Sequence, residues 1–291
     1  MNSLPPQDAF LSSEYEKKSA DEALFHVVPV PLEQTVSYGG GSRNGPQAIL
    51  DASYQLEAFD GVSFPGEAGI HTTPPVDCEG EIGEVLNRIE GAAKNVFDCG
   101  KIPVFLGGEH SLTQAPIRAL SKLRSEFGVV QIDAHADLRD EYEGSPWSHA
   151  CVMRRVVELG IPAFQIGVRN LCREEIEFRA ETAIAYFDAM AIHRDGLPSR
   201  LLPADFPKNI YLTFDVDGLD ASLMPATGAP EPGGLFWHDA LAAVENCLQV
   251  GRSLIGLDVV ELAPIPGFHS ADYVTAKLTY ALMGFAARSR Q

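Results

Sequence analysis

Short apolar segments recur along this chain, and most of them stop at glycines or at acidic and histidine side chains. The segments span residues 24–30, 102–106, 129–132, 163–167, 183–187, 210–214 and 254–260. Segments of this length are typical of buried strands, whereas the stretches between them carry helical periodicity. Strands that alternate with helices are joined by right-handed crossovers. The pattern therefore predicts an α/β fold with a mostly parallel sheet that helices cover on both faces.

Several helices have clear start or stop signals. Residues 81–99 show the i, i+3, i+4, i+7 spacing of an amphipathic helix, and Gly100 is suited to end it. Four more helices are expected. One starts at Pro46, one starts at Ser111 or Thr113, and the other two span residues 238–250 and 272–287. The glycine run at 39–41 lacks the G-K-[ST] continuation of a phosphate loop. We expect a loop near the mouth of a site there.

The chain divides into two unequal parts. Residues 1–22 are polar, and we expect a loosely held N-terminal arm or a short helix. Residues 23–291 contain no linker, internal repeat or low-complexity tract, and a chain of 291 residues can bury one large core. The economical expectation is an arm followed by a single domain.

Composition limits the partners of the protein. The net charge of −18 argues against nucleic acid and anionic membranes but is compatible with a cationic substrate. The N-terminus lacks the apolar core of a signal peptide, and no apolar run is long enough to span a bilayer. The five cysteines include no C-x-x-C pair, so neither a disulfide framework nor a thiolate zinc site is indicated. We expect a reduced, cytoplasmic protein.

The most distinctive stretch is GVVQIDAHAD, residues 128–137. It places Asp133, His135 and Asp137 at alternate positions, which on an extended backbone project their side chains to one side. Carboxylate oxygen and imidazole nitrogen suit a divalent ion such as Mn²⁺, Zn²⁺, Ni²⁺ or Co²⁺. The triplet alone is moderately specific, because D-x-H-x-D arises by chance in acidic proteins. Further ligands must therefore come from elsewhere in the chain.

More ligand-type side chains follow the carboxyl ends of other predicted strands: His110, Asp215, Asp217 and Glu261. In open parallel sheets, ligands bind at this edge. Each residue alone is easily explained as a loop, turn or capping residue. The location of all of them at one edge of the sheet is harder to explain in this way. Crowded carboxylates repel one another and raise each other's pKa values unless cations neutralise them. About six such ligands suit two ions, and His110, Asp133, His135, Asp137, Asp215 and Asp217 make up that number. Two ions about 3.5–4 Å apart can share a water molecule and lower its pKa, so hydrolytic chemistry is predicted.

Four sequence blocks carry a family resemblance. They are GGEHS at 107–111, DAHAD at 133–137, SHACVMRR at 148–155 and DVDGLDASLMPATGAPEPGG at 215–234. The set, in this order, resembles the ureohydrolases, the arginase and agmatinase superfamily, with the agmatinase branch most similar. These enzymes hydrolyse guanidino compounds to urea and an amine. The resemblance extends from about Pro29 to the C-terminus, and it implies a three-layer α/β/α fold in a homotrimer or homohexamer.

The resemblance also implies a cofactor and residue roles. Two Mn²⁺ ions per chain are expected, with Ni²⁺ or Co²⁺ as alternatives. One ion would be held by His110, Asp133, Asp137 and Asp215. The other would be held by Asp133, His135, Asp215 and Asp217, so that Asp133 and Asp215 bridge.

Three further roles concern the reaction itself. His149 matches the family's proton-shuttling histidine, and Asp137 would pass a proton to the leaving amine. Glu261 matches the carboxylate that grips the substrate guanidinium, a charge-assisted contact that chemistry favours independently. The alternatives are a surface-loop role for His149 and a helix-cap or salt-bridge role for Glu261.

The loop after the third ligand bears on the substrate. Arginases resemble one another in a longer polar loop that holds the α-amino and α-carboxylate groups, whereas RDEYEGSPWS, residues 139–148, is acidic and lacks that pattern. The resemblance therefore favours agmatine, a small cationic substrate hydrolysed to putrescine and urea in polyamine biosynthesis. Charge for an amine tail could come from Glu141, Glu143 or Glu231, and Trp147 could reshape the tail pocket.

Other assignments stay open. Guanidinobutyrate, guanidinopropionate, guanidine and arginine are alternative substrates. A compound with a carboxylate tail would require an arginine or lysine side chain at the mouth of the site. Metal-dependent deacetylases of acetylated amines share the fold but keep only one metal position, so six ligands argue against them. A non-catalytic family member would not need His149 and Glu261 beside a full ligand set.

Overall fold

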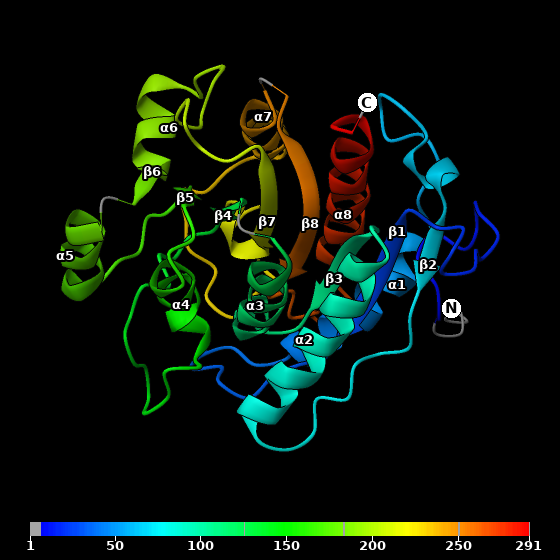
Figure 1. The fold of residues 1–291 in the computed structure, drawn as a ribbon, viewed down its shortest axis with the longest axis horizontal. Coiled ribbons are helices and arrows are strands. Elements are labelled where there is room, and N and C mark those ends of the chain that lie inside the picture. The colour runs from blue at the N-terminus through cyan, green and yellow to red at the C-terminus, as the bar shows by residue number, and fades with distance from the viewer. Residues whose placement is uncertain (1–6, 125, 183, 250, 291) are drawn as a thin grey trace.

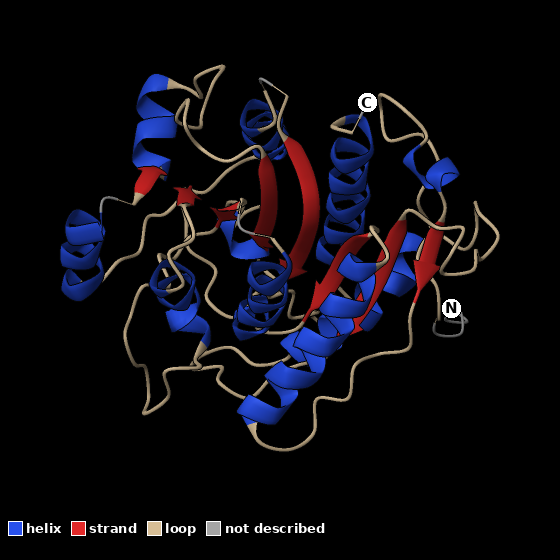
Figure 2. Ribbon diagram, in the orientation of Figure 1, coloured by secondary structure: helices blue, strands red, loops and turns tan. Residues whose placement is uncertain are grey.

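A computed structural model of the chain describes residues 7–124, 126–182, 184–249 and 251–290. Its strands are β1 (Phe25–Val30), β2 (Ile70–Thr72), β3 (Ile102–Gly107), β4 (Gly128–Ile132), β5 (Ala163–Ile166), β6 (Ala185–Phe187), β7 (Asn209–Asp215) and β8 (Ser253–Val260). They form one eight-stranded sheet in the order β2-β1-β3-β8-β7-β4-β5-β6, and each neighbouring pair is parallel (Figure 2). The predicted α/β class is therefore confirmed.

Helices cover both faces of this sheet (Figure 1). One face packs against α1 (Gly45–Ser53), α6 (Ala189–Asp195), α7 (Trp237–Cys247) and α8 (Ser270–Arg288). The other packs against α2 (Ile82–Asp98), α3 (Gln114–Leu123), α4 (Val152–Glu158) and α5 (Arg173–Thr182). These layers confirm the α/β/α sandwich. In the described part of the chain, no helix is long and apolar enough to cross a membrane.

Strand β1 shows why the strands read as continuous apolar runs. Phe25 and Val27 pack in the core that contains α1 and α8, whereas Val28 and Val30 pack in the core beneath α2. All six residues of β1 are buried. A parallel sheet covered on both faces buries both sets of side chains, so polar residues have no exposed face to occupy.

The helix signals agree with most of the observed helix boundaries. α2 begins one residue after Glu81, and Gly100 follows its end with φ 69°, in the left-handed region that glycine adopts readily. Pro46 lies in the first turn of α1, as expected. The helix expected from Ser111 or Thr113 begins as a 3₁₀ turn before α3. β2, α5 and α6 were not expected, because β2 has three residues and α5 (REEIEFRAET) has no clear apolar stripe.

Part of the N-terminal segment packs on the core. Residues 1–6 of the expected arm lie outside the described residues. Phe10 and Leu11 are buried in the main core, and the Leu11 backbone N–H donates to Ser53 Oγ at 2.9 Å. Burying a large apolar side chain stabilises by about 1.5–3 kcal/mol. The expectation of a loosely held arm is therefore wrong for these two residues.

Candidate metal centre

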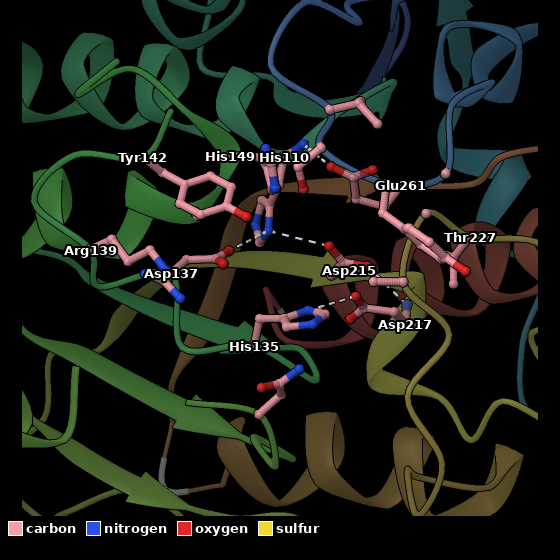
Figure 3. Close-up of a pocket in the computed structure, with 18 of the residues that line it drawn as sticks. His110, His135, Asp137, Arg139, Tyr142, His149, Asp215, Asp217, Thr227 and Glu261 are labelled. Carbon is pink, nitrogen blue, oxygen red and sulfur yellow. Dashed lines mark hydrogen bonds and ion pairs between the residues drawn. The ribbon is translucent and has the colours of Figure 1, made fainter. Parts of the chain in front are cut away.

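The candidate site lies at the carboxyl ends of β3, β8, β7 and β4, four strands that are neighbours in the sheet. His110 follows β3, Glu261 follows β8, and residues 133–137 follow β4. Asp215 is the last residue of β7 and Asp217 lies just beyond it. Because parallel strands end at the same edge, residues far apart in sequence meet here. All six predicted ligands are brought together, and Figure 3 labels all of them except Asp133.

A pocket of about 250 Å³ opens onto this cluster. Five of the six predicted ligands line it, together with His149 and Glu261. Asp133, the sixth ligand, is fully buried. A pocket of this size suits a small molecule that enters from the loops and meets the buried cluster at the end.

The predicted ligands form two compact groups that share one residue. His110 Nδ1 lies 3.1 Å from Asp133 Oδ2 and 2.9 Å from Asp137 Oδ2. His135 Nδ1 lies 2.9 Å from Asp217 Oδ2 and 3.6 Å from Asp133 Oδ1. Each group can offer its donor atoms to one ion, and Asp133 turns a different oxygen to each. This is the arrangement that a bridging carboxylate requires.

Asp215 is placed less tightly. Its Oδ2 lies 3.4 Å from His110 Nδ1, so it approaches the first group. Its Oδ1 accepts the backbone N–H of Asp217 at 2.9 Å. Neither compact group includes Asp215. The second bridging role therefore stays a prediction.

Asp133, His135 and Asp137 converge for a reason that differs from the expected one. β4 ends at Ile132, so these residues lie in a loop and not on extended strand. Asp133 Oδ1 accepts the backbone N–H of His135 at 2.6 Å, which closes a turn. Asp137 has φ 53°, a left-handed conformation that costs about 1–3 kcal/mol and persists where the surroundings hold it. The expected extended backbone was wrong, although the side chains do meet.

The electrostatics of the cluster favour bound positive charge. Burial alone would lower the pKa of His110, but its contacts with Asp133, Asp137 and Asp215 raise that pKa well above its ordinary value. Burial and then the Asp133 charge raise the pKa of Asp137 to about 7. Burial, followed by the Asp217 charge, raises the pKa of Asp215 well above its usual range. Without metal ions, the site must therefore hold protons to offset its carboxylates.

The His110 ring tests whether metal ions fit this site. Its Nε2 lies 2.8 Å from Thr213 Oγ1, and Thr213 Oγ1 lies 2.6 Å from Asp258 Oδ1. The carboxylate accepts, so the Thr213 hydroxyl donates to it and accepts from His110 Nε2–H. In the neutral ring Nδ1 then keeps a lone pair, and this buried atom has no hydrogen-bond partner among the described residues. A lone pair that faces carboxylate oxygens is stabilised by a cation between them, and the N and O donors suit Mn²⁺, Ni²⁺ or Co²⁺.

Replacing Thr213 with valine should weaken metal binding about 10- to 100-fold, the usual cost of losing the partner of a metal-binding histidine. Valine keeps the shape of threonine but cannot accept from His110 Nε2 or donate to Asp258. The ring then loses the contact that sets its tautomer and orientation. Competition with a chelator measures the affinity. Thr213→Ser, which keeps the hydroxyl, is the control, and equal affinities of the two variants would contradict this role.

Glu261, which follows β8, and His149, which begins a 3₁₀ turn, flank the cluster (Figure 3). Glu261 is buried with φ 67°, and its Oε1 accepts the backbone N–H of His110 at 2.6 Å. Burial and the neighbouring Glu109 raise the pKa of Glu261 to about 8, so a cationic group beside it is favoured. Burial lowers the pKa of His149, although Glu109 opposes the shift. The ring is therefore neutral near pH 7 and able to accept a proton.

The residues expected to recognise the substrate tail lie elsewhere. The pocket lining includes none of the four: Glu141, Glu143, Glu231 and Trp147. Glu141 and Glu143 are exposed on the loop. Glu231 adjoins the pocket, because its Oε1 accepts from Nδ2 of Asn170, which lines it. Their proposed tail contacts therefore find no direct support in the pocket.

Two residues of the same loop line the pocket but were not predicted, Arg139 and Tyr142. Tyr142 precedes a tight turn at Glu143-Gly144, whose φ values of 51° and 82° are those of a type I′ turn. The Tyr142 ring stands edge-on to His149, with centroids 5.9 Å apart, and its hydroxyl points into the pocket (Figure 3). The Arg139 guanidinium lies 4.9 Å from the Tyr142 ring centroid. Glu-Gly predicts a type I′ turn less strongly than Asn-Gly does, so the sequence gave little indication that Tyr142 would face the pocket.

Comparison with known proteins identifies the family of the chain. The profile of the Arginase family matches residues 23–284. The N(1)-aminopropylagmatine ureohydrolase of Synechocystis sp. is 42% identical over 97% of this chain and 95% of that protein. The agmatinase of Pyrococcus horikoshii is 32% identical over 92% of this chain and 93% of that protein. The crystal structure of the agmatine ureohydrolase of Thermoplasma volcanium superimposes with a TM-score of 0.86 at 28% identity, covering 98% and 96% of the two chains. This chain belongs to the arginase family and is a ureohydrolase of guanidino compounds.

Proposed function

We propose that the protein is a two-metal ureohydrolase that releases urea from a linear guanidino compound with an amine tail. Mn²⁺ is the ion that we expect, with Ni²⁺ or Co²⁺ as alternatives. The observation that supports metal-dependent hydrolysis most directly is the buried His110 Nδ1, which faces three carboxylate oxygens. The first ion would be held by His110, Asp133, Asp137 and Asp215. The second would be held by Asp133, His135, Asp215 and Asp217.

Ions bound in this cluster would supply a water molecule of lowered pKa. Glu261 receives the planar guanidinium, which has five N–H donors and no acceptor, through the lone pairs that the His110 N–H leaves free. Asp137 takes a proton and passes it to the departing amine, and His149 exchanges protons with solvent through the pocket mouth.

Within this class, we propose N(1)-aminopropylagmatine as the first substrate and agmatine, which the sequence alone favoured, as the second. The identities of 42% with the named N(1)-aminopropylagmatine ureohydrolase and 32% with the named agmatinase support this order. Loss of the amidino group as urea would leave an aminopropyl-substituted putrescine from the first and putrescine from the second. Either product is a polyamine or its precursor. Both substrates carry an amine tail, which suits a chain of net charge −18.

Arg139 supports a competing substrate class. Its guanidinium lines the pocket and lies over the Tyr142 ring. A fixed planar cation at this position would attract a carboxylate tail, as in guanidinobutyrate or guanidinopropionate. The acidic cluster does not decide between the classes, because every candidate carries the same guanidinium.

A urea-release assay on the Mn²⁺-loaded protein tests both levels of the proposal. The substrates are N(1)-aminopropylagmatine, agmatine, arginine, guanidinobutyrate, guanidinopropionate and guanidine. We expect the highest kcat/KM with N(1)-aminopropylagmatine. Preference for guanidinobutyrate would support the Arg139 alternative, and urea from none of the six would overturn the proposed activity. Ni²⁺- and Co²⁺-loaded samples in parallel identify the effective ion.

We also propose that the enzyme acts in the cytoplasm as a homotrimer or homohexamer, as the family resemblance implies. A chain of 31.5 kDa makes these states easy to separate by light scattering coupled to gel filtration. A monomer at micromolar concentration would contradict the assembly.

A further inference from the structure

A buried carboxylate beside the metal centre ties together segments that are distant in sequence. Glu109 is fully buried. Its Oε2 accepts the backbone N–H groups of Gln34 and Thr35, both at 2.6 Å. Its Oε1 accepts the Thr35 hydroxyl at 3.0 Å and a short bond from the Ser111 hydroxyl. All four partners donate, so the loop that follows β1 is held by this one carboxylate.

The Thr35 hydroxyl extends this contact to His149. Thr35 Oγ1 accepts the backbone N–H of His149 at 3.0 Å and lies 3.2 Å from its Nδ1. A hydroxyl has one donor and two acceptor positions. The donor goes to Glu109, and one acceptor position takes the His149 backbone N–H. The remaining position must face Nδ1, so a proton on Nδ1 completes the hydroxyl's hydrogen bonds.

This arrangement selects one tautomer of the ring. With Nδ1 protonated, Nε2 is the nitrogen that keeps a lone pair. Two groups compete with the Thr35 hydroxyl for the ring. Ser148 Oγ lies 3.4 Å from Nδ1 and already caps the following turn through Ala150, and the Thr35 backbone carbonyl also interacts with the ring. The shorter contact to Thr35 favours the Nδ1–H form. The same contact persists when Nε2 gains a proton, so the ring need not turn during proton transfer.

We propose that Thr35, held by Glu109, is a positioning residue that fixes His149 in the Nδ1–H tautomer and leaves Nε2 open to the pocket. This inference rests on the proposed proton-transfer role of His149. Thr35 itself touches neither the reacting atoms nor the predicted metal ligands. Its role parallels that of a carboxylate or hydroxyl that orients a general base in other enzymes.

Kinetics should separate this role from a structural one. Thr35→Val should lower kcat by about 10- to 100-fold, part of the 10²–10⁴ that general acid–base catalysis contributes. KM and metal content should stay within about twofold, since the valine keeps the side-chain shape. Thr35→Ser keeps the hydroxyl and should retain kcat within about threefold. In a His149→Asn background, Thr35→Val should cause almost no further loss, whereas a structural effect would persist there.

The tautomer can be read without any turnover. The full-length protein, labelled with ¹⁵N-histidine and loaded with diamagnetic Zn²⁺, gives distinct nitrogen shifts for protonated and unprotonated ring positions. His149→Gln identifies the His149 signals among those of the eight histidines. We expect Nδ1–H in the wild type, in Thr35→Ser and in Ser148→Ala, and its loss in Thr35→Val.

The kinetic and tautomer measurements together distinguish failure of the positioning role from failure of the proposed function. An Nε2–H tautomer in the wild type, or an unchanged tautomer in folded Thr35→Val, would overturn the positioning role whatever the substrate. An Nδ1–H form that Ser148→Ala abolishes would assign the role to Ser148 instead. Absence of urea with every guanidino compound, together with the expected tautomer shifts, would overturn the proposed function and leave the Thr35 contact intact.

Discussion

Replacing Asp133 with alanine should abolish stable binding of both metal ions and lower urea release by at least about a thousandfold. Asp133 offers one oxygen to the group around His110 and the other to the group around His135. Its loss therefore removes a donor from both positions at once. Metal ions contribute several kcal/mol of transition-state stabilisation, and each 1.4 kcal/mol corresponds to about tenfold in rate.

The same substitution should also remove the stabilisation that bound metal gives to the fold. Asp133 is a buried carboxylate among like charges, and its repulsion contributes to the raised pKa values of Asp137, Asp215 and Asp217. Alanine relieves that repulsion, but it also removes the acceptor of the His135 backbone N–H and of Gln131 Nε2, so the readout is the change of melting temperature on adding metal. A metal that binds only the folded state stabilises it by about 2.7 kcal/mol at a hundred times its Kd. The wild type should therefore gain melting temperature with Mn²⁺, and Asp133→Ala should not.

Elemental analysis after mild chelation and melting curves with Mn²⁺ or EDTA measure these effects. Asp140→Ala is the matched control, because Asp140 lies on the same loop system but is exposed and pairs with Arg155. The control should retain two ions per chain and its metal-dependent shift. Two ions retained by Asp133→Ala, or one ion or none in the wild type, would contradict the two-metal assignment.

The meeting of the six ligand-type side chains could be predicted because its signal is local. Each ligand follows a short apolar run, and parallel topology brings the ends of such runs to one edge whatever the lengths of the intervening helices. The proximity of Asp133 and Asp217 could be predicted from this topology alone, without knowing how the side chains pack. The detailed path was still wrong for residues 133–137, where an aspartate turn and a left-handed Asp137 replace extended strand.

The supporting contacts could not be predicted, because they depend on which buried atoms meet across the sheet. Thr213 and Asp258 are internal residues of neighbouring strands, and their register decides that the hydroxyl reaches His110. Thr35 and Glu109 are 74 residues apart, and only the folded loops join them. The prediction of the tail-binding residues found no support for a similar reason. The turn at Glu143-Gly144 directs Tyr142 into the pocket and leaves the neighbouring acidic side chains outside it.

Replacing Glu261 with glutamine should spare metal binding and lower kcat/KM by about 30- to 1000-fold. Glutamine keeps an oxygen for the His110 backbone N–H, so the loop between β3 and α3 stays in place. Its amide group, however, presents N–H donors where the substrate guanidinium also presents only donors. The lost charge-assisted hydrogen bonds and the unpaired donors together account for about 2–4 kcal/mol, which corresponds to this range of rates. Most of the loss should appear in KM if Glu261 binds substrate and transition state alike, and in kcat if the contact tightens during the reaction.

The control for Glu261→Gln is Glu245→Gln, which makes the same change of net charge on the exposed surface of α7. It should leave kcat/KM unchanged within about twofold, since a distant exposed charge is screened by salt. Elemental analysis should find two ions per chain in both variants, because Glu261 belongs to neither compact donor group. Loss of metal in Glu261→Gln would instead make Glu261 a ligand, and full activity would remove it from substrate recognition. The split between metal content and kcat/KM thus separates the two carboxylate functions of the pocket, holding the ions and holding the guanidinium.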